Sequence, residues 1–411
     1  MLDDKIKKAL YLLFAGGMIA STLGFLLSVI LLKLYGANDF GKYVLYQSYI
    51  LFFASVFSLQ TWQPLIKELI SSEMKRNVFI GFFIPEIIFS FIGLIVAYKF
   101  QQLFFNFFNI NEASYSLMML SPIIFLQNSS FFGVFRFYNK HFFVNLVQIS
   151  NVSLTIILGT ILFSFGMEIF LNYIYTVYAI TFLIAFFLSM LLLNKENNSV
   201  SLITINGIRK SIRLSFPFYV TSLTDIPIRD ATLFFVNKYC GIEITSFYRI
   251  LMQFSSLLSK VSLPIYQASY PEMVLLSKDK KNNELTKLIK NVTFLSFILI
   301  SPIALLLIAT YDYWIPMFFS ESYKAFKEVF VFFMLIYALS GVFVAVHPAF
   351  VVICSHKLMV YITLFSNVMY LIVLIILAPF LGVWGILIAC FCQISLVIGI
   401  KYKVIRSEIR K

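Results

Sequence analysis

The stretch from Ala9 to Leu32, ALYLLFAGGMIASTLGFLLSVILL, decides the fold because none of its side chains carries a charge. A helix that rises about 1.5 Å per residue crosses a hydrocarbon core of about 30 Å in about 20 residues, and this stretch is long enough. It is also longer than the apolar core of a signal peptide, about 7 to 15 residues, and no clear small-residue cleavage site follows it. We therefore interpret it as a retained first membrane span.

Similar apolar stretches recur along the whole chain and leave almost no residues for a soluble domain. We predict an all-α polytopic membrane protein with twelve transmembrane helices. The predicted spans cover residues 9–32, 43–66, 78–100, 116–135, 142–163, 173–193, 214–236, 247–269, 291–310, 328–351, 358–378 and 385–400.

The composition excludes most soluble classes. Of the 411 residues, 60% are hydrophobic and only 12% are charged, and a soluble protein of this size cannot cover its surface with so few charges. The net charge of +13 indicates nucleic-acid binding only when a basic face lies on a soluble body, and no such body is predicted. Soluble enzymes, secreted disulfide modules and nucleic-acid-binding domains are therefore poor interpretations.

Lysine and arginine residues fall mostly on one side of the predicted spans. With a cytoplasmic N-terminus, 23 of them lie in cytoplasmic segments and 6 in outer loops. This split favours both termini inside, because cytoplasmic loops carry the excess of positive residues. The basic charge then lies along the cytoplasmic membrane surface, where anionic lipids attract it.

A weak internal repeat divides the chain into two halves. Gly36 and Tyr43 follow the first span with six residues between them, and Gly241 and Tyr248 follow the seventh span at the same spacing. An even number of helices in each half lets both halves insert with the same orientation, as in alternating-access transporters. We predict two lobes of six helices around a central cavity, namely residues 1–193 and 214–411, joined by a cytoplasmic linker over 194–213.

One motif after the first span imitates a nucleotide site. Residues 36–42, GANDFGK, match the G-x-x-x-x-G-K part of a phosphate-binding loop. A functional loop continues with Ser or Thr between a strand and a helix, whereas Tyr43 follows here between two membrane helices. We interpret the segment as a turn in which Asn38 or Asp39 caps the second helix. No metal-ligand spacing and no nucleophile with its base stands out, so we predict no metal, no cofactor and no enzyme activity.

Charged side chains within the seventh span are the first indication of a functional site. Asp225, Arg229 and Asp230 lie within it, and each charge costs about 2.5 to 3.5 kcal/mol at a helix centre. Pro217 and Pro227 break or kink the same helix, which is tolerated where the freed backbone groups face protein or a wet cavity. Asp225 and Arg229 share a helix face, so a structural ion pair and a cavity-lining role both fit them.

The eighth span carries a polar stripe. Its members, at offsets of 0, 4, 7, 11 and 18 residues, lie within about 40° of one another on a helix. They are Arg249, Gln253, Ser256, Lys260 and Gln267. Arg249 lies near the outer end, where its side chain can also extend to the interface. Lys260 lies near the middle, so we predict that Lys260, with Gln253 and Ser256, lines a hydrated cavity.

Uncharged polar side chains indicate a hydrated seam in the first half as well. They are Gln60, Gln63, Asn128, Asn145, Gln148 and Asn151. Taken one at a time, such residues more often form hydrogen bonds in helix packing than contacts to a ligand. Glu86, beside Pro85 in the third span, is the remaining acid within a span and a candidate proton site.

Three segments carry a resemblance to a known family. They are KLYGANDFGKY over residues 33–43, RLSFPFY over 213–219 and FLGVWG over 380–385. In the order and spacing of these segments, and in span number, loop lengths and half-way division, the whole chain resembles the Wzx-type polysaccharide (O-antigen) flippases. These belong to the MATE-like multidrug/oligosaccharidyl-lipid/polysaccharide exporter superfamily.

The resemblance implies that a central cavity moves an undecaprenyl-diphosphate-linked oligosaccharide from the inner to the outer leaflet of the bacterial cytoplasmic membrane. The product would serve the synthesis of lipopolysaccharide or another cell-surface polysaccharide. In this interpretation Arg229, Arg249 and Lys260 hold the diphosphate, because Arg binds phosphate oxygens bidentately and Lys supplies a point charge. The expected partners are this lipid-linked cargo, membrane lipids and other polysaccharide-assembly membrane proteins, and no nucleic acid.

Two energy sources suit such a cycle. With a negative cell interior, each exported negative charge is favoured by about 2.3 kcal/mol per 100 mV. Asp225, Asp230 or Glu86 are candidates for additional proton coupling.

Two other functions stay open at this stage. A cation-coupled exporter of drugs or metabolites favours a cavity dominated by acids, whereas spans seven and eight bring three basic groups against two acids. Its deletion would cause sensitivity to cationic dyes. A membrane glycan polymerase acting on the same lipid-linked sugars tends to carry a large outer loop, and the longest outer loop predicted here covers residues 101–115. Its deletion would leave single repeat units outside the cell.

Overall fold

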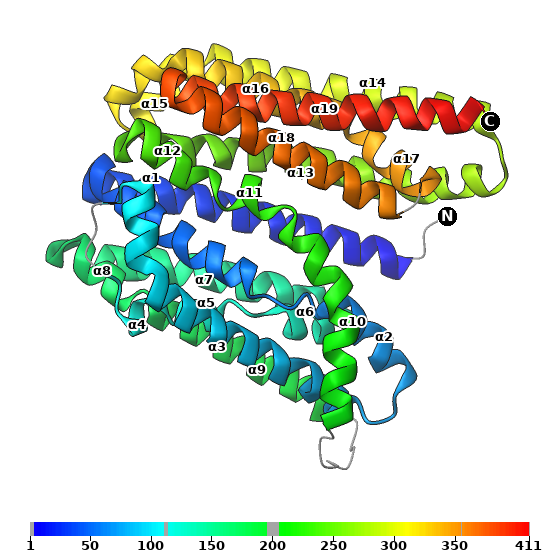
Figure 1. The fold of residues 1–411 in the computed structure, drawn as a ribbon, viewed down its shortest axis with the longest axis horizontal. Helices are drawn as coiled ribbons and strands as arrows, with labels where there is room; N and C mark the ends of the chain where they lie inside the picture. Colours follow the sequence, from blue (N-terminus) through cyan, green and yellow to red (C-terminus); the bar gives the residue numbers. More distant parts are fainter. Residues whose placement is uncertain (1–3, 111–113, 195–204, 355, 411) are drawn as a thin grey trace. The chain divides into compact units, whose positions relative to one another are not determined.

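Helices and the turns between them make up the described parts of the chain. The computed structural model describes residues 4–110, 114–194, 205–354 and 356–410, and all regular elements within these ranges are helices (Figure 1). Two compact units, residues 1–238 and 239–411, make up the fold.

The first unit begins with α1 (Asp4–Val56), which is two helices that meet at a kink at Gly36, and continues with further helices. In chain order the elements after α1 are α2 (Trp62–Ser71), α3 (Lys75–Phe108), α4 (Leu117–Leu120), α5 (Pro122–Phe125), α6 (Ser129–Phe137), α7 (His141–Ile161), the 3-10 helix η1 (Phe163–Phe165), α8 (Met167–Tyr173), α9 (Tyr175–Asn194), α10 (Ile205–Leu223), α11 (Ile226–Arg229) and most of α12 (Thr232–Cys240), whose last two residues belong to the second unit. Within the unit, α1 packs on α7, α2 on α6, and α3 on α10.

The second unit is built mainly from five long helices. Its elements are α13 (Ile242–Lys278), α14 (Asn282–Ala309), α15 (Tyr311–Phe318), η2 (Glu321–Phe326), α16 (Lys327–Val342), η3 (Phe343–Ala345), α17 (Val346–Ile353), α18 (His356–Leu381) and α19 (Val383–Arg410). Here α14 contacts both α13 and α16, and α19 contacts α16, α17 and α18, so the long helices run beside one another (Figure 1).

The two compact units do not coincide with the lobes expected from the sequence. They group α10, α11 and α12 with the helices before them, whereas the sequence places the boundary in a linker over residues 194–213. Residues 195–204 of that linker lie outside the described ranges, and residues 205–213 belong to α10. The lobe boundaries of the sequence therefore stay a prediction.

Nine helical segments of the described chain are long and apolar enough to cross a membrane. They are Ala15–Val56, Lys75–Phe108, Leu117–Phe137, His141–Ile161, Met167–Asn194, Asn282–Ala309, Glu321–Ile353, Leu358–Leu381 and Val383–Ile409. The predicted class, an all-helical multi-pass membrane protein, is confirmed. The predicted twelve spans do not correspond to these segments one to one, because α1 holds most of the first two spans, the seventh is divided among α10 to α12, and the eighth lies in the more polar α13.

Both members of the predicted repeat have the same backbone conformation. Gly36 interrupts α1 with φ 80° and ψ 171°, and Gly241 precedes α13 with φ 85° and ψ 175°. This region is essentially restricted to glycine. The tyrosines seven residues further on, Tyr43 and Tyr248, are both buried. The weak sequence repeat therefore marks a shared structural corner, at which one helix turns into the next.

The close packing of α1 on α7 requires a glycine at position 16. A Cβ atom on Gly16 would lie 2.0 Å from Nδ2 of Asn145, a distance that no real contact allows. Asn145 itself is buried. Small residues at such contacts let helix backbones approach closely, so this amide serves helix packing.

Candidate functional site

The seventh predicted span is a broken helix. Pro227 occupies the first turn of α11, where its missing N–H costs nothing. Turn residues separate this short helix from α10 and from α12. The predicted break is therefore found at Pro227, whereas Pro217 lies inside α10. Asp225 precedes α11 and is exposed, and Asp230 follows it and is buried. Both acids have interaction partners within the chain.

Arg229 is the last residue of α11. Its side chain lies outside what the structure describes, so the predicted pair with Asp225 and the predicted contact with a diphosphate both stay predictions.

The predicted stripe of the eighth span lies on one unbroken helix. Because α13 runs from Ile242 to Lys278, the spacing of Arg249, Gln253, Ser256 and Lys260 places them on one face. Arg249, Gln253 and Lys260 are half-buried, and Ser256 is exposed. The side chain of Gln267 lies outside the description.

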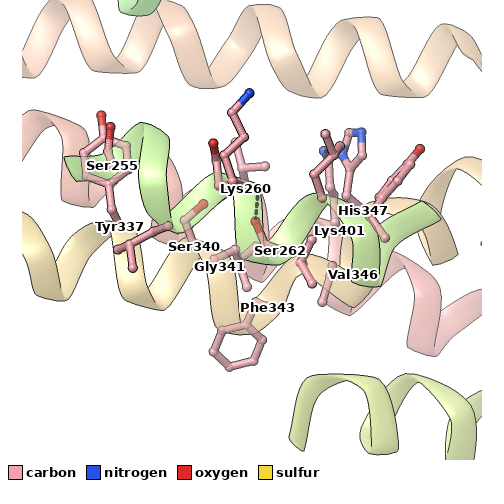
Figure 2. Close-up of a pocket in the computed structure, with 17 residues that line it drawn as sticks. Ser255, Lys260, Ser262, Tyr337, Ser340, Gly341, Phe343, Val346, His347 and Lys401 are labelled. Carbon is pink, nitrogen blue, oxygen red and sulfur yellow. Dashed lines mark hydrogen bonds between the residues drawn. The ribbon is translucent and has the colours of Figure 1, made fainter. Parts of the chain in front are cut away.

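Lys260 lines a cavity of about 530 Å³ within the second unit (Figure 2). We call this cavity the lysine cavity. Its lining comes from α13, α16, η3, α17 and α19 and comprises Ser255, Leu258, Ser259, Lys260, Ser262, Leu263, Tyr266, Tyr337, Ser340, Gly341, Phe343, Val344, Val346, His347, Val397, Ile398 and Lys401. None of these lining residues is acidic. The lining is thus apolar and hydroxylated, with lysine as its only charged residue type.

Lys401 on α19 is a second lysine in the same wall, and the sequence did not single it out. It is buried, and its Nζ lies 2.8 Å from Nδ1 of His347 on α17. When Lys401 is protonated, its ammonium donates this hydrogen bond to Nδ1, which places the imidazole proton on Nε2. Figure 2 shows Lys401 beside His347, while Lys260 stands apart from them along α13.

A second pocket, of about 490 Å³, lies within the first unit. We call it the amide pocket, because four of the six predicted seam residues line it, namely Gln60, Asn128, Gln148 and Asn151. Gln63 and Asn145 do not belong to its lining. Four of the residues of the predicted seam therefore line a defined pocket. Asn145 instead contributes to the packing of α1 on α7.

An arginine and a tryptophan complete the amide pocket. The guanidinium carbon of Arg136 lies 4.0 Å from the centre of the Trp62 ring, which is a cation–π stack. Arg136 belongs to the last turn of α6, and Trp62 is the first residue of α2. The packing of α2 on α6 thus brings the two side chains together. The sequence places Trp62 within the last turn of the predicted span over 43–66 and Arg136 one residue beyond the span over 116–135, so neither lies deep in a span.

Glu86 on α3 lies behind the amide pocket rather than in its wall. It is fully buried, and its Oε1 accepts from the backbone N–H of Ser129 at 2.9 Å. Its Oε2 accepts from the backbone N–H of Ser130 at 3.1 Å, from the Thr61 hydroxyl at 2.9 Å, and from the Ser130 hydroxyl. The carboxyl group therefore caps the N-terminus of α6, where backbone donors lack partners within the helix.

Glu86 also holds the start of α2 in place. The backbone N–H groups of Thr61 and Trp62 donate to Oγ of Ser129, at 3.0 and 3.1 Å. One buried acid thus joins the N-terminal ends of α2 and α6. Trp62 lies at the joined end of α2, whereas Arg136 lies at the opposite end of α6. The proposed role of Glu86 in proton coupling stays a prediction.

Comparison with known proteins identifies the fold. Neither the known family models nor the curated proteins match this sequence. Among solved structures, the inward-facing conformation of a multidrug resistance MATE family transporter of the MOP superfamily aligns with a TM-score of 0.68 and 14% identity, over 95% of this chain and 94% of that chain. A mutant MATE transporter of Vibrio cholerae aligns with a TM-score of 0.67 and 13% identity, over 99% and 96%.

A MOP superfamily transporter from Pyrococcus furiosus aligns with a TM-score of 0.62 and 16% identity, over 98% of this chain and 96% of that chain. At such low identity the likeness concerns the fold. The chain therefore has the MATE-like fold of MOP superfamily transporters.

Proposed function

We propose that this protein is a flippase that moves an undecaprenyl-diphosphate-linked oligosaccharide from the inner to the outer leaflet of the bacterial cytoplasmic membrane. The lining of the lysine cavity carries the proposal, because Lys260 and Lys401 share one wall without an acid among its lining residues. Such a wall suits an anionic cargo. Both chain termini are expected on the cytoplasmic side.

Transfer of a diphosphate into hydrocarbon without cations is prohibitively costly. A lysine ammonium supplies a compact point charge for a phosphate oxygen, and charge-assisted hydrogen bonds of this kind are about twice as strong as neutral ones. Lys401 already donates to His347, which holds the ammonium in one orientation. The hydroxyls of Ser255, Ser259 and Ser262 along the same wall donate to backbone carbonyls of α13, so they offer acceptor lone pairs to the hydroxyls of the sugar.

The known transporters of this fold support both the general activity and a reversal of charge preference. The similar solved structures are transporters, and one is a multidrug resistance protein. The Pyrococcus furiosus transporter is described as having a binding pocket of reverse polarity that suggests a different function. One fold thus accommodates pockets of opposite polarity, and the lysine cavity favours the anion-binding kind for this chain.

A leaflet-accessibility assay with fluorescent undecaprenyl-diphosphate oligosaccharide in proteoliposomes tests the proposal. Lys260→Gln and Lys401→Gln are each expected to lower the flipping rate at least tenfold, because a hydrogen bond to a charged group contributes about 1.5 to 3 kcal/mol. Arg229→Gln tests the remaining sequence prediction in the same assay.

Lys403→Gln is the matched control, since Lys403 is exposed on the same helix two residues beyond Lys401. It is expected to retain the wild-type rate. Flipping that survives in the Lys260→Gln/Lys401→Gln double variant would refute the assignment of the headgroup site.

A cation-coupled drug exporter is the second candidate function. It is favoured by the buried carboxyl of Glu86 and by the multidrug transporters that share the fold. The two functions differ in their cargo, so uptake of a cationic dye into inverted vesicles discriminates them. Dye transport that depends on Glu86, together with no flipping of the lipid-linked sugar, would favour the exporter.

A further inference from the structure

The amide pocket has the chemistry of a separate ligand site. Its volume of about 490 Å³ lies within the range of small-molecule pockets, about 300 to 1,000 Å³. Besides the four amides, Ser58, Tyr178 and Thr181 contribute hydroxyl groups to its wall. The described lining contains no acid, and both oxygens of the nearby Glu86 are already occupied by donors from the chain.

Arg136 is placed to bind an anion. Within the described residues no carboxylate forms an ion pair with it, although it is half-buried. The guanidinium carbon of Arg136 lies over the Trp62 ring, 4.0 Å from its centre. Because the guanidinium donors lie in its plane, stacking on a ring leaves them available for two oxygens of one carboxylate. Trp62 therefore acts as the support that orients Arg136.

The amides are placed to bind hydroxyl groups. Oδ1 of Asn128 is buried and has no hydrogen-bond donor among the described residues, which is costly unless a ligand or water supplies one. The hydrogen bonds that the amide nitrogens donate are long. Nδ2 of Asn128 lies 3.5 Å from the carbonyl of Phe125, and Nδ2 of Asn151 lies 3.4 Å from the Thr181 hydroxyl. These groups have hydrogen-bonding capacity to spare.

We infer that the amide pocket binds an acidic sugar, that is, a hydroxyl-rich ring bearing a carboxylate, with Arg136 on the carboxylate and the amides on the hydroxyls. This inference rests on the proposed function and extends it, because it names one chemical class of sugar in the cargo. The cargo then has two anionic groups, a diphosphate for the lysine cavity and a uronate for the amide pocket.

Binding to the purified full-length chain in detergent tests the inference without transport. Isothermal titration calorimetry at pH 7 would use three probes: trigalacturonate, its methyl ester with the same rings and no charge, and inorganic phosphate. We expect saturable binding of trigalacturonate and at least tenfold weaker binding of the other two. Equal binding of the methyl ester, binding of phosphate as tight as that of trigalacturonate, or no binding of trigalacturonate would overturn the inference.

Variants locate the binding to this pocket. Arg136→Gln is expected to weaken trigalacturonate binding at least tenfold, and Arg136→Lys by a smaller factor, because it keeps the charge and loses the fork of donors. Lys75→Gln is the matched control, since Lys75 lies 5.0 Å from the Phe137 ring as another cation–π pair of this unit and does not line the pocket. Wild-type affinity in both Arg136 variants, or equal losses in Lys75→Gln, would place the ligand elsewhere.

The two proposals fail in different ways. Wild-type binding of trigalacturonate by a chain that flips no lipid-linked oligosaccharide would refute the proposed function and leave the sugar site standing. Flipping that continues in a chain without trigalacturonate binding would refute the sugar site and leave the flippase standing.

Discussion

The two units of the chain treat their buried charges in opposite ways. In the first unit, the carboxyl group of Glu86 is enclosed by four donors that belong to two helix ends. In the second unit, Lys401 has His347 as a partner and remains part of a cavity wall. An enclosed charge organises the backbone around a pocket, whereas a charge in the wall is placed to meet a ligand. Loss of the enclosed charge should therefore lower mainly the stability of the protein, and loss of the charge in the cavity wall should lower mainly the transport rate.

Removal of the Glu86 carboxyl group is expected to have the largest effect on stability. Glu86→Ala leaves the backbone N–H groups of Ser129 and Ser130 buried without acceptors, and each such group costs about 1 to 3 kcal/mol. The loss of unfolding free energy should be about 2 to 6 kcal/mol, measured by SDS titration of the protein in mixed micelles. Glu86→Gln retains one oxygen acceptor and should lose about half as much.

Glu68→Gln is the control for this comparison, because Glu68 is another acid of the first unit and pairs with Lys210 near the surface. A Glu86→Ala protein as stable as the control would show that the acid does not organise the ends of α2 and α6. It would also contradict the comparison in which the buried charge of the first unit stabilises the fold and that of the second unit serves transport.

Loss of the imidazole acceptor in the second unit should affect transport more than stability. His347→Leu leaves the Lys401 ammonium without this partner and is expected to lower the flipping rate about tenfold to a hundredfold, from about 1.5 to 3 kcal/mol for a hydrogen bond to a charged group. His347→Gln keeps an acceptor and should retain most of the rate. Equal flipping by both variants would mean that the orientation of Lys401 is unimportant.

The shared glycine corners predict effects of equal size in the two units. Gly36→Ala and Gly241→Ala force a side chain into a backbone region that costs about 1 to 3 kcal/mol. Neither position has another atom within 4 Å of an added Cβ, so the loss is conformational and free of steric clash. SDS titration of both variants should show similar losses of unfolding free energy.

The controls for the glycine corners are Gly24→Ala in α1 and Gly399→Ala in α19, which also have open space around an added Cβ. Both lie inside helices, where alanine is favoured over glycine by up to about 1 kcal/mol. A large loss of unfolding free energy in Gly36→Ala together with no loss in Gly241→Ala would contradict a structural corner shared by the two units. The sequence repeat would then be a coincidence.

Hydropathy predicted the class of the fold, and polar spacing drew attention to Lys260 and to four amides that line cavities in the structure. Long apolar runs lead to helices because a bilayer demands internally satisfied backbones. The four amides of the amide pocket were found because polar groups inside spans are conspicuous in an apolar sequence. Gln60 precedes α2, Asn128 precedes α6, and Gln148 and Asn151 lie on α7. Their meeting depends on tertiary packing, which spacing along one helix does not encode.

The missed residues lie at the ends of spans. Lys401 follows the predicted twelfth span by one residue and was assigned to the cytoplasmic surface, yet α19 continues to Arg410. His347 lies near the end of the predicted span over 328–351, and Arg136 lies one residue beyond the predicted span over 116–135. A long side chain near a predicted boundary has two readings, at the surface or in the wall of a cavity, and only the packing of other helices against it decides between them.

Substitutions in the ion pairs near the surface are expected to change the unfolding free energy least. They show how little a charge contributes to stability when water reaches it. The first unit has Lys210 with Glu68 at 2.5 Å, and the second has Lys327 with Asp312. Exposed pairs contribute about 0.2 to 1 kcal/mol, since solvent screens them and ordering two long side chains costs entropy. Glu68→Gln and Asp312→Asn should each lower the unfolding free energy by that amount in 0.05 M NaCl, and by less in 1 M NaCl. A loss of unfolding free energy above about 2 kcal/mol in either variant would contradict the idea that burial determines how much a charged side chain contributes to stability.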